Sequence, residues 1–142
     1  MCAILDTNCC HEIFGNSQTV AGKRFLDWLN SHGKLVIGGK LGSELAKNSR
    51  AARLVAALRA AGKAKLVSDL VVQQEEQALT KLRILKSNDA HVVALARVTK
   101  ARILYSHDEN LHADFKNHQI ISQPRGSVYQ GQTNLLTRDA CP

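Results

Sequence analysis

Short apolar runs that alternate with segments of helical character constrain the fold of this chain more than any other feature. In the predicted helices the apolar residues recur at near-helical spacing, as Val20, Phe25 and Leu29 do. Strands separated by helices form a parallel sheet that is covered on both faces. The order of elements therefore predicts an α/β fold. The predicted strands are residues 2–5, 34–37, 65–67, 102–106 and 119–122.

Helix signals lie between these runs. Gly15 and Asn16 end a first short helix, Ser17 is a candidate cap for the second, and Gly62 ends an alanine-rich one. The chain of 142 residues is long enough for one domain with its own core. We expect this domain to span 1–128 and to be followed by a polar tail, 129–142. The predicted helices are residues 11–14, 17–31, 41–48, 51–61, 69–85, 88–100 and 109–115.

The chain is strongly basic, with a net charge of +7. This charge favours a polyanionic partner, either a nucleic acid or an acidic protein. Aromatic residues make up 4% of the chain, so base stacking cannot dominate recognition. The N-terminal apolar run is too short for a signal peptide, and no stretch approaches the ~20 apolar residues of a membrane span. We expect a cytoplasmic protein without a membrane partner.

Four acids stand where predicted strands end or helices begin. Asp6 and Asp108 follow strands directly or within two residues, Glu44 comes shortly after the second strand, and Asp89 lies in the first turn of a helix. Each has an ordinary alternative, a helix cap or an exposed helix residue. Together they converge on the carboxyl edge of a parallel sheet, where such folds place their ligand sites. Four carboxylates there form a hard-cation site and indicate metal-dependent phosphodiester chemistry.

Cysteine and histidine give no spacing that is typical of a zinc site. The four cysteines, at positions 2, 9, 10 and 141, contain no Cys-x-x-Cys pair. We expect reduced thiols that pack as small apolar residues. His91, His107 and His112 do not share the spacing of a zinc helix motif, so we do not expect them to bind metal.

Four segments that contain these acids, residues 4–8, 42–45, 88–96 and 103–108, resemble the successive motifs of the PIN-domain ribonucleases, which include the VapC-type toxins. The likeness covers residues 2 to about 122, with the motifs in order. It implies a PIN-like three-layer α/β/α sandwich with a central parallel sheet of four or five strands.

The resemblance also implies an activity and a set of partners. The activity is endonucleolytic hydrolysis of single-stranded or structured RNA with one or two Mg²⁺ or Mn²⁺ ions. The implied partners are a small antitoxin protein, if the chain is the toxin of a toxin–antitoxin pair, and a second copy in a homodimer. The family's acids, which serve as metal ligands and catalytic residues, fall on Asp6, Glu44, Asp89 and Asp108.

Three further residues match positions beside the family's acids, namely Asn8, Ser106 and Asn110. Asn110 stands where family members often carry another acid, which leaves open whether one or two ions bind. Asp114 is a substitute for that acid, with a solvated helix residue as the alternative. We expect the RNA backbone phosphates to contact four basic residues, Lys40, Lys47, Arg50 and Arg53. The last three form a strip if one helix runs through them, and an ordinary solvated face is the alternative.

Two other functions fit parts of the pattern. The first is a non-catalytic RNA-binding or protein-interaction module on the same fold, which metal binding would distinguish. The second is a phosphohydrolase with Asp6 as nucleophile, but Asn8 stands where such enzymes carry a second Asp. Cleavage of DNA also stays open, because the same ions cut either polymer.

Overall fold

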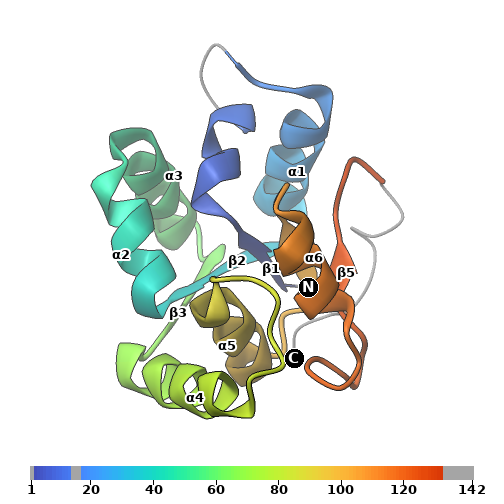
Figure 1. Cartoon of the computed structure of the whole chain (residues 1–142). Coiled ribbons are helices and arrows are strands. Elements are labelled where there is room, and N and C mark those ends of the chain that lie inside the picture. The colour runs from blue at the N-terminus through green and yellow to red at the C-terminus, as the bar shows by residue number, and fades with distance from the viewer. Residues whose placement is uncertain (1, 14–16, 133–142) are drawn as a thin grey trace.

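The computed structural model describes residues 2–13 and 17–132 and contains a five-stranded, entirely parallel sheet (Figure 1). The strand order is β3-β2-β1-β4-β5, which confirms the predicted sheet. The central strand β1 pairs Ala3 with Leu35 on one side and with Ile103 on the other. The strands are β1 Cys2–Leu5, β2 Lys34–Gly38, β3 Ala64–Val67, β4 Ile103–Tyr105 and β5 Ser127–Val128.

Helices cover both faces of this sheet. Helices α1 and α3 lie on one side, and α4 and α5 lie on the other (Figure 1). This is the three-layer α/β/α arrangement that the sequence predicts. The helices are the 3₁₀ helix η1 Thr7–Glu12 and the α-helices α1 Val20–Ser31, α2 Gly39–Lys47, α3 Ser49–Ala60, α4 Asp69–Leu82, α5 Ala90–Thr99 and α6 Glu109–Lys116.

Local capping decides two helix boundaries. Helix α1 begins later than predicted, because Thr19 rather than Ser17 caps it, accepting from the Gly22 N–H at 2.9 Å. Asn48 ends α2 in an extended conformation and caps α3 through its side-chain oxygen. One continuous helix through Lys47 and Arg50 is therefore ruled out, and the predicted basic strip spans two helices.

The predicted strand at 119–122 is wrong. Its apolar residues Ile120 and Ile121 are buried, but their N–H groups donate to the Asn117 carbonyl within a turn. The Ser122 carbonyl accepts from the buried Arg102 guanidinium at 3.2 Å. These backbone groups are engaged locally or by a side chain, and the last strand forms later, where Ser127 pairs with Ile103.

The core packs η1 and α1 tightly against the sheet. The ring centroid of Phe25 on α1 lies 5.0 Å from that of Tyr105 on β4 and 5.6 Å from that of Tyr129. A Cβ at Gly22 would lie 1.8 Å from the Glu12 carbonyl oxygen, so α1 and η1 can approach this closely only with glycine at that position.

The thiols follow the expectation only in part. Cys9 and Cys10 are free and buried, as predicted, whereas Cys2 is disulfide-bonded. Along the ranges that the structure describes, no helix combines the length and apolar character of a membrane span. Tyr129, assigned to the tail from sequence, is buried and donates its hydroxyl to the Ala21 carbonyl at 2.9 Å. Residues 133–142 of the predicted tail lie outside the described residues.

Candidate functional site

The candidate site lies where the strand order reverses, between β1 and β4. The chain proceeds from β1 to β2 and β3, then crosses to β4 on the other side of β1. Open α/β sheets bind ligands at this point, outside the carboxyl ends of the strands. Asp6 directly follows β1, and its N–H donates to the Tyr105 carbonyl at the end of β4 at 2.9 Å. Ser106 follows β4 and donates its hydroxyl to Asp6 Oδ2 at 2.7 Å.

Asp6 and Asp108 both act as helix caps. Asp6 Oδ1 accepts from the Asn8 N–H at 3.3 Å and caps η1. Asp108 Oδ1 accepts from the Asn110 and Leu111 N–H groups at 2.9 and 3.2 Å and caps α6. The Ser106 hydroxyl accepts from the Asp108 N–H at 3.2 Å while donating to Asp6, so one side chain links the two acidic segments. Capping uses a single oxygen of Asp108 and leaves the other for a ligand.

Glu44 approaches the site from α2. Its Oε2 accepts from the Thr7 hydroxyl at 3.4 Å, and its Oε1 lies 3.6 Å from Nε2 of His91 on α5. The His91 side chain is 3% exposed, and its Nε2 has no hydrogen-bond partner within the described part of the chain. Glu44 is thus held between η1 and α5, which places its carboxylate beside the carboxyl end of β1.

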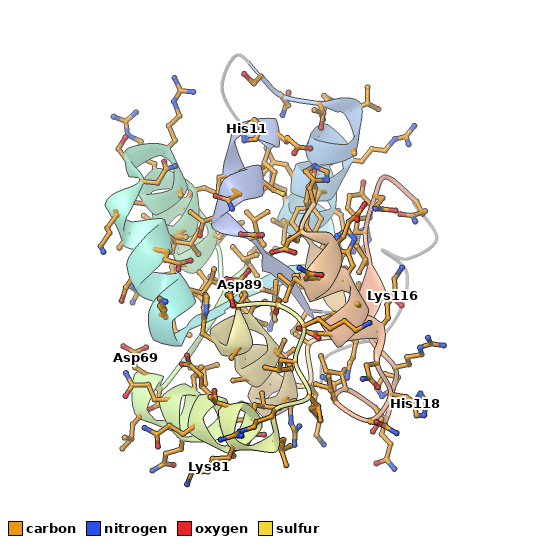
Figure 2. All side chains as sticks on the ribbon, viewed as in Figure 1. His11, Asp69, Lys81, Asp89, Lys116 and His118 are labelled. Carbon is orange, nitrogen blue, oxygen red and sulfur yellow. The ribbon has the colours of Figure 1, made fainter. Side chains whose placement is uncertain are left out.

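Asp89 stands at the start of α5, near the centre of the view in Figure 2. It occupies the N-cap position, but its side chain makes no capping hydrogen bond. Its N–H donates to the Ser87 hydroxyl at 3.3 Å, which fixes the backbone while leaving the carboxyl group free of a cap. Among the three acids at helix N-cap positions, Asp6, Asp89 and Asp108, only Asp89 makes no capping hydrogen bond with its side chain.

Electrostatics tie the four acids together. Partial burial is the main cause that raises the pKa of Asp89, and nearby His91 opposes this effect. The remaining causes are the negative charges of Asp6, Asp108 and Glu44, each of which raises the pKa further. The four acids are therefore near enough for their charges to influence the ionisation of Asp89.

The four carboxylates fit a hard divalent cation by their chemistry, because Mg²⁺ and Mn²⁺ prefer oxygen ligands. In the described ranges, a different trio is the one whose ligand atoms all lie within 4.8 Å of one another: Cys9, Glu12 and His107. A group able to hold a metal ion is thus present beside the acids, with mixed chemistry.

The other predicted residues lie around the acids in different ways. Asn8 and Asn110 reach Asp6 and Asp108 through backbone N–H groups, and both are exposed. The basic candidates are all exposed, and they make no ion pair with any described acid. Two lie on α2, Lys40 and Lys47, and two on α3, Arg50 and Arg53.

Sequence reasoning gave the wrong environment for Asp114. It is 1% exposed rather than solvated, and its two carboxylate oxygens accept from the Lys86 and Ser87 N–H groups at 2.8 Å each. Ser87 in turn accepts from the Asp89 N–H, so Asp114 holds the connection that presents Asp89. Asp114 therefore does not take the place of the acid that family members often carry at the position of Asn110. Its spacing gave no signal of this role, because the partners are 27 and 28 residues away.

Comparison with known proteins identifies the family and the fold. The family model of the PIN domain matches residues 3–116. Among solved structures, the crystal structure of VapBC2 from Rickettsia felis bound to a DNA fragment from their promoter is similar, with a TM-score of 0.51. The alignment has 14% identity and covers 92% of this chain and 100% of that chain, a likeness of fold. No curated protein matches the sequence.

Proposed function

The chain belongs to the PIN-domain family, and from this premise we propose that it is a metal-dependent endoribonuclease that hydrolyses RNA phosphodiester bonds. The observation that carries the proposal is the arrangement at the switch point, where Ser106 links Asp6 and Asp108 and Thr7 holds Glu44. Asp6, Glu44, Asp89 and Asp108 are the proposed metal ligands and catalytic residues.

Mg²⁺ or Mn²⁺, one ion or two, is the proposed cofactor, and when bound it activates water and stabilises charge on phosphoryl oxygens. The chain's own residues orient the ligands. Ser106 holds Asp6 with its hydroxyl and Asp108 through the backbone N–H, and Thr7 holds Glu44. Asn8 and Asn110 complete the surroundings by donating backbone N–H groups. Orientation before binding lowers the entropic cost of assembling the site.

Basic residues on α2 and α3 are the proposed contacts to RNA phosphates. Lys40, Lys47, Arg50 and Arg53 are exposed, and the net charge of +7 favours a polyanion. The substrate is single-stranded or structured RNA. Because phosphate contacts carry no sequence information, they support binding to many sequences, and the choice of cleavage site depends on other contacts.

We also propose a toxin–antitoxin role in the cytoplasm, with a small antitoxin protein as partner and a homodimer as the assembly. The similar VapBC2 structure is a complex bound to promoter DNA, and this supports an antitoxin partner. The alternative is a non-catalytic RNA-binding or interaction module on the same fold. Against this alternative, all four acids are present, and a copy without activity would be free to lose them. The domain of residues 1–128 with its tail of 129–142 stays a prediction.

The test is cleavage of a mixed, labelled single-stranded RNA with Mg²⁺, with Mn²⁺ and with chelator. Wild type should cut with either metal, and Asp6→Asn should abolish cleavage while the fold is retained. The matched control is Asp27→Asn, because Asp27 is exposed on α1 and pairs only with Lys23 at 3.5 Å. Full activity of Asp6→Asn would remove Asp6 from the site. Wild type that neither cuts nor binds metal would favour the non-catalytic module.

A further inference from the structure

We propose that Cys9, Glu12 and His107 form a second metal site, suited to Zn²⁺, next to the acidic site and distinct from it in chemistry. This inference goes beyond the proposed nuclease function, because none of the three residues is among the four acids. Cys9 and Glu12 come from η1, and His107 lies in the segment between β4 and α6. The tertiary structure joins residues that are up to 98 positions apart.

The geometry brings three different ligand types to one point. The Cys9 sulfur, a Glu12 carboxylate oxygen and a His107 ring nitrogen all lie within 4.8 Å of one another. Nε2 of His107 is 2.5 Å from Glu12 Oε2. Zinc binds such ligands at about 2.0–2.3 Å in a tetrahedral arrangement, which spaces the ligand atoms by a few ångströms. His107 and Glu12, which now share a direct hydrogen bond, would have to move apart to admit an ion between them.

The donor set selects the class of metal. Sulfur and imidazole ligands favour zinc and similar borderline ions, whereas Mg²⁺ and Mn²⁺ prefer the all-oxygen acidic site. Three protein ligands leave a fourth position for water. The side chain of His107 is 61% exposed and that of Glu12 is 11% exposed, so an ion has an entry path from the histidine side. A buried thiol and carboxylate then hold it from within.

Neighbouring groups orient the carboxylate. The Tyr105 hydroxyl donates to Glu12 Oε1 at 3.0 Å, which leaves Oε2 directed at His107. Gly22 packs against the Glu12 backbone and fixes the end of η1. Outer hydrogen bonds of this kind hold metal ligands in position and strengthen binding. The site thus has a second layer of support, which chance proximity of three side chains would not provide.

Charge balance also favours a cation. Asp6 and Glu12 place negative charge beside the Cys9 sulfur. A divalent ion would compensate this charge, and the thiol proton would leave to solvent as the sulfur–metal bond forms. The bound ion would tie η1 to the segment after β4, and these two segments carry the cap residues Asp6 and Asp108.

The experiment titrates the metal-free, full-length chain with Co²⁺, a spectroscopic substitute for Zn²⁺. One Co²⁺ ion bound to wild type should give a sulfur-to-cobalt charge-transfer band and tetrahedral visible bands, and Zn²⁺ should displace it; Co²⁺ in the all-oxygen acidic site would give no sulfur band. Cys9→Ser should lose the charge-transfer band. Cys10→Ser is the matched control, because Cys10 is also a free, buried thiol on η1 but is outside the trio. It should keep the band.

Further variants make the result independent of the folding of any one of them. His107→Gln changes an exposed residue and should weaken Co²⁺ binding at least about 10-fold, whereas His118→Gln, an exposed control, should not. Tyr105→Phe keeps the ring and removes only the hydroxyl, so about 10-fold weaker binding is expected. Asp6→Asn should retain the band even though it abolishes RNA cleavage, which separates this site from the acidic one.

The proposal is overturned if wild type binds neither ion, or if Cys9→Ser keeps the band. Equal Co²⁺ affinity of wild type and His107→Gln would also overturn it. If Asp6→Asn loses cobalt together with cleavage, the ion belongs to the acidic site, and the zinc site is again overturned. Failure of RNA cleavage in wild type with an intact cobalt site would instead count against the nuclease function alone.

Discussion

Single residues at the site differ in how much of their role is structural. Asp6 and Asp108 cap helices, so part of their effect on stability is the ordinary effect of a cap. Glu44 is half-buried between Thr7 and His91. Asp89 caps nothing with its side chain and carries the repulsion of the other three acids. The pKa of Asp89 is raised mainly by its partial burial, and the charges of the other three acids raise it further.

Asp89→Asn should stabilise the metal-free protein at neutral pH. The pKa of Asp89 is raised in the folded chain, so between its unfolded and folded pKa values the folded state binds more protons. Stability from this group is present at acidic pH and is lost as pH rises through the folded pKa. The variant removes the charge and keeps a residue suited to an N-cap.

Urea unfolding of both proteins with chelator, from acidic to neutral pH, measures this effect. The difference between variant and wild type should grow as pH rises and then level off above the folded pKa. A difference that stays constant with pH would contradict the raised pKa of Asp89. Added Mn²⁺ should stabilise wild type more than the variant, because only wild type keeps the fourth carboxylate.

At the scale of elements, α6 organises the site from a distance. Its first residue is capped by Asp108, and its interior residue Asp114 binds the connection between α4 and α5. That connection presents Asp89 through Ser87. Two acids of the site thus depend on the placement of one short helix. The eight-residue helix α6 thus links the segment after β4, which carries Asp108, to the start of α5, where Asp89 lies.

Asp114→Ala should be strongly destabilising and should also impair cleavage. Each of the two lost hydrogen bonds has a charged acceptor, so the unfolding free energy should fall by about 3 kcal/mol. Two backbone N–H groups would lose their partners. Asp27→Ala on α1 is the control and should cost less than about 1 kcal/mol, because its ion pair with Lys23 is exposed.

Denaturant unfolding measures the stability, and RNA cleavage at a temperature where the variant is folded measures the site. If Asp114→Ala is as stable as wild type, water must replace Asp114 as the acceptor for the Lys86 and Ser87 N–H groups. Normal cleavage by a folded Asp114→Ala would show that Asp89 keeps its position without this anchor.

At the scale of the whole molecule, the charge distribution fits the proposed binding of a polyanion such as RNA. The chain has 19 Lys and Arg residues against 12 acids, and a third of the acids form the candidate site. The break at Asn48 divides the basic residues between α2 and α3. Lys47 and Arg50 flank this break from opposite sides, so both can contact one strand of RNA only if it crosses the junction.

Lys47→Ala with Arg50→Ala should weaken RNA binding and reduce its salt dependence. Loss of two phosphate contacts to a single strand lowers the slope of log affinity against log salt by about 1.4. The control is Lys81→Ala with Lys116→Ala, two exposed lysines on α4 and α6 that Figure 2 labels. It should leave the slope nearly unchanged.

Binding is measured with the Asp6→Asn background, which prevents cleavage, over a range of salt concentrations. An unchanged slope in the Lys47 and Arg50 variant would mean that this junction does not touch phosphate. A similar loss in both double variants would indicate that net charge, rather than a defined contact surface, governs binding.

The sequence by itself determined the alternation of strands and helices and the position of the acids after strands. Both are local properties: apolar spacing reports which face of an element is buried, and a polar residue after a buried strand marks its end. Hence β1, β2, β3 and β4 and the α/β class were predicted within a few residues. Asp6, Asp89 and Asp108 were singled out because each stands at such a boundary, and Glu44 because it follows β2 within α2.

Only the tertiary structure decided which distant residues meet. The strand order puts β4 beside β1, and this brings Ser106 to Asp6 across 100 residues. It also buries Asp114 under the α4–α5 connection and joins His107 to Glu12. The Arg102 guanidinium donates to the Ser122 carbonyl, and residues 119–122 form a turn instead of the predicted strand. Such contacts depend on long-range packing, because a local spacing pattern carries no information about a partner a hundred residues away.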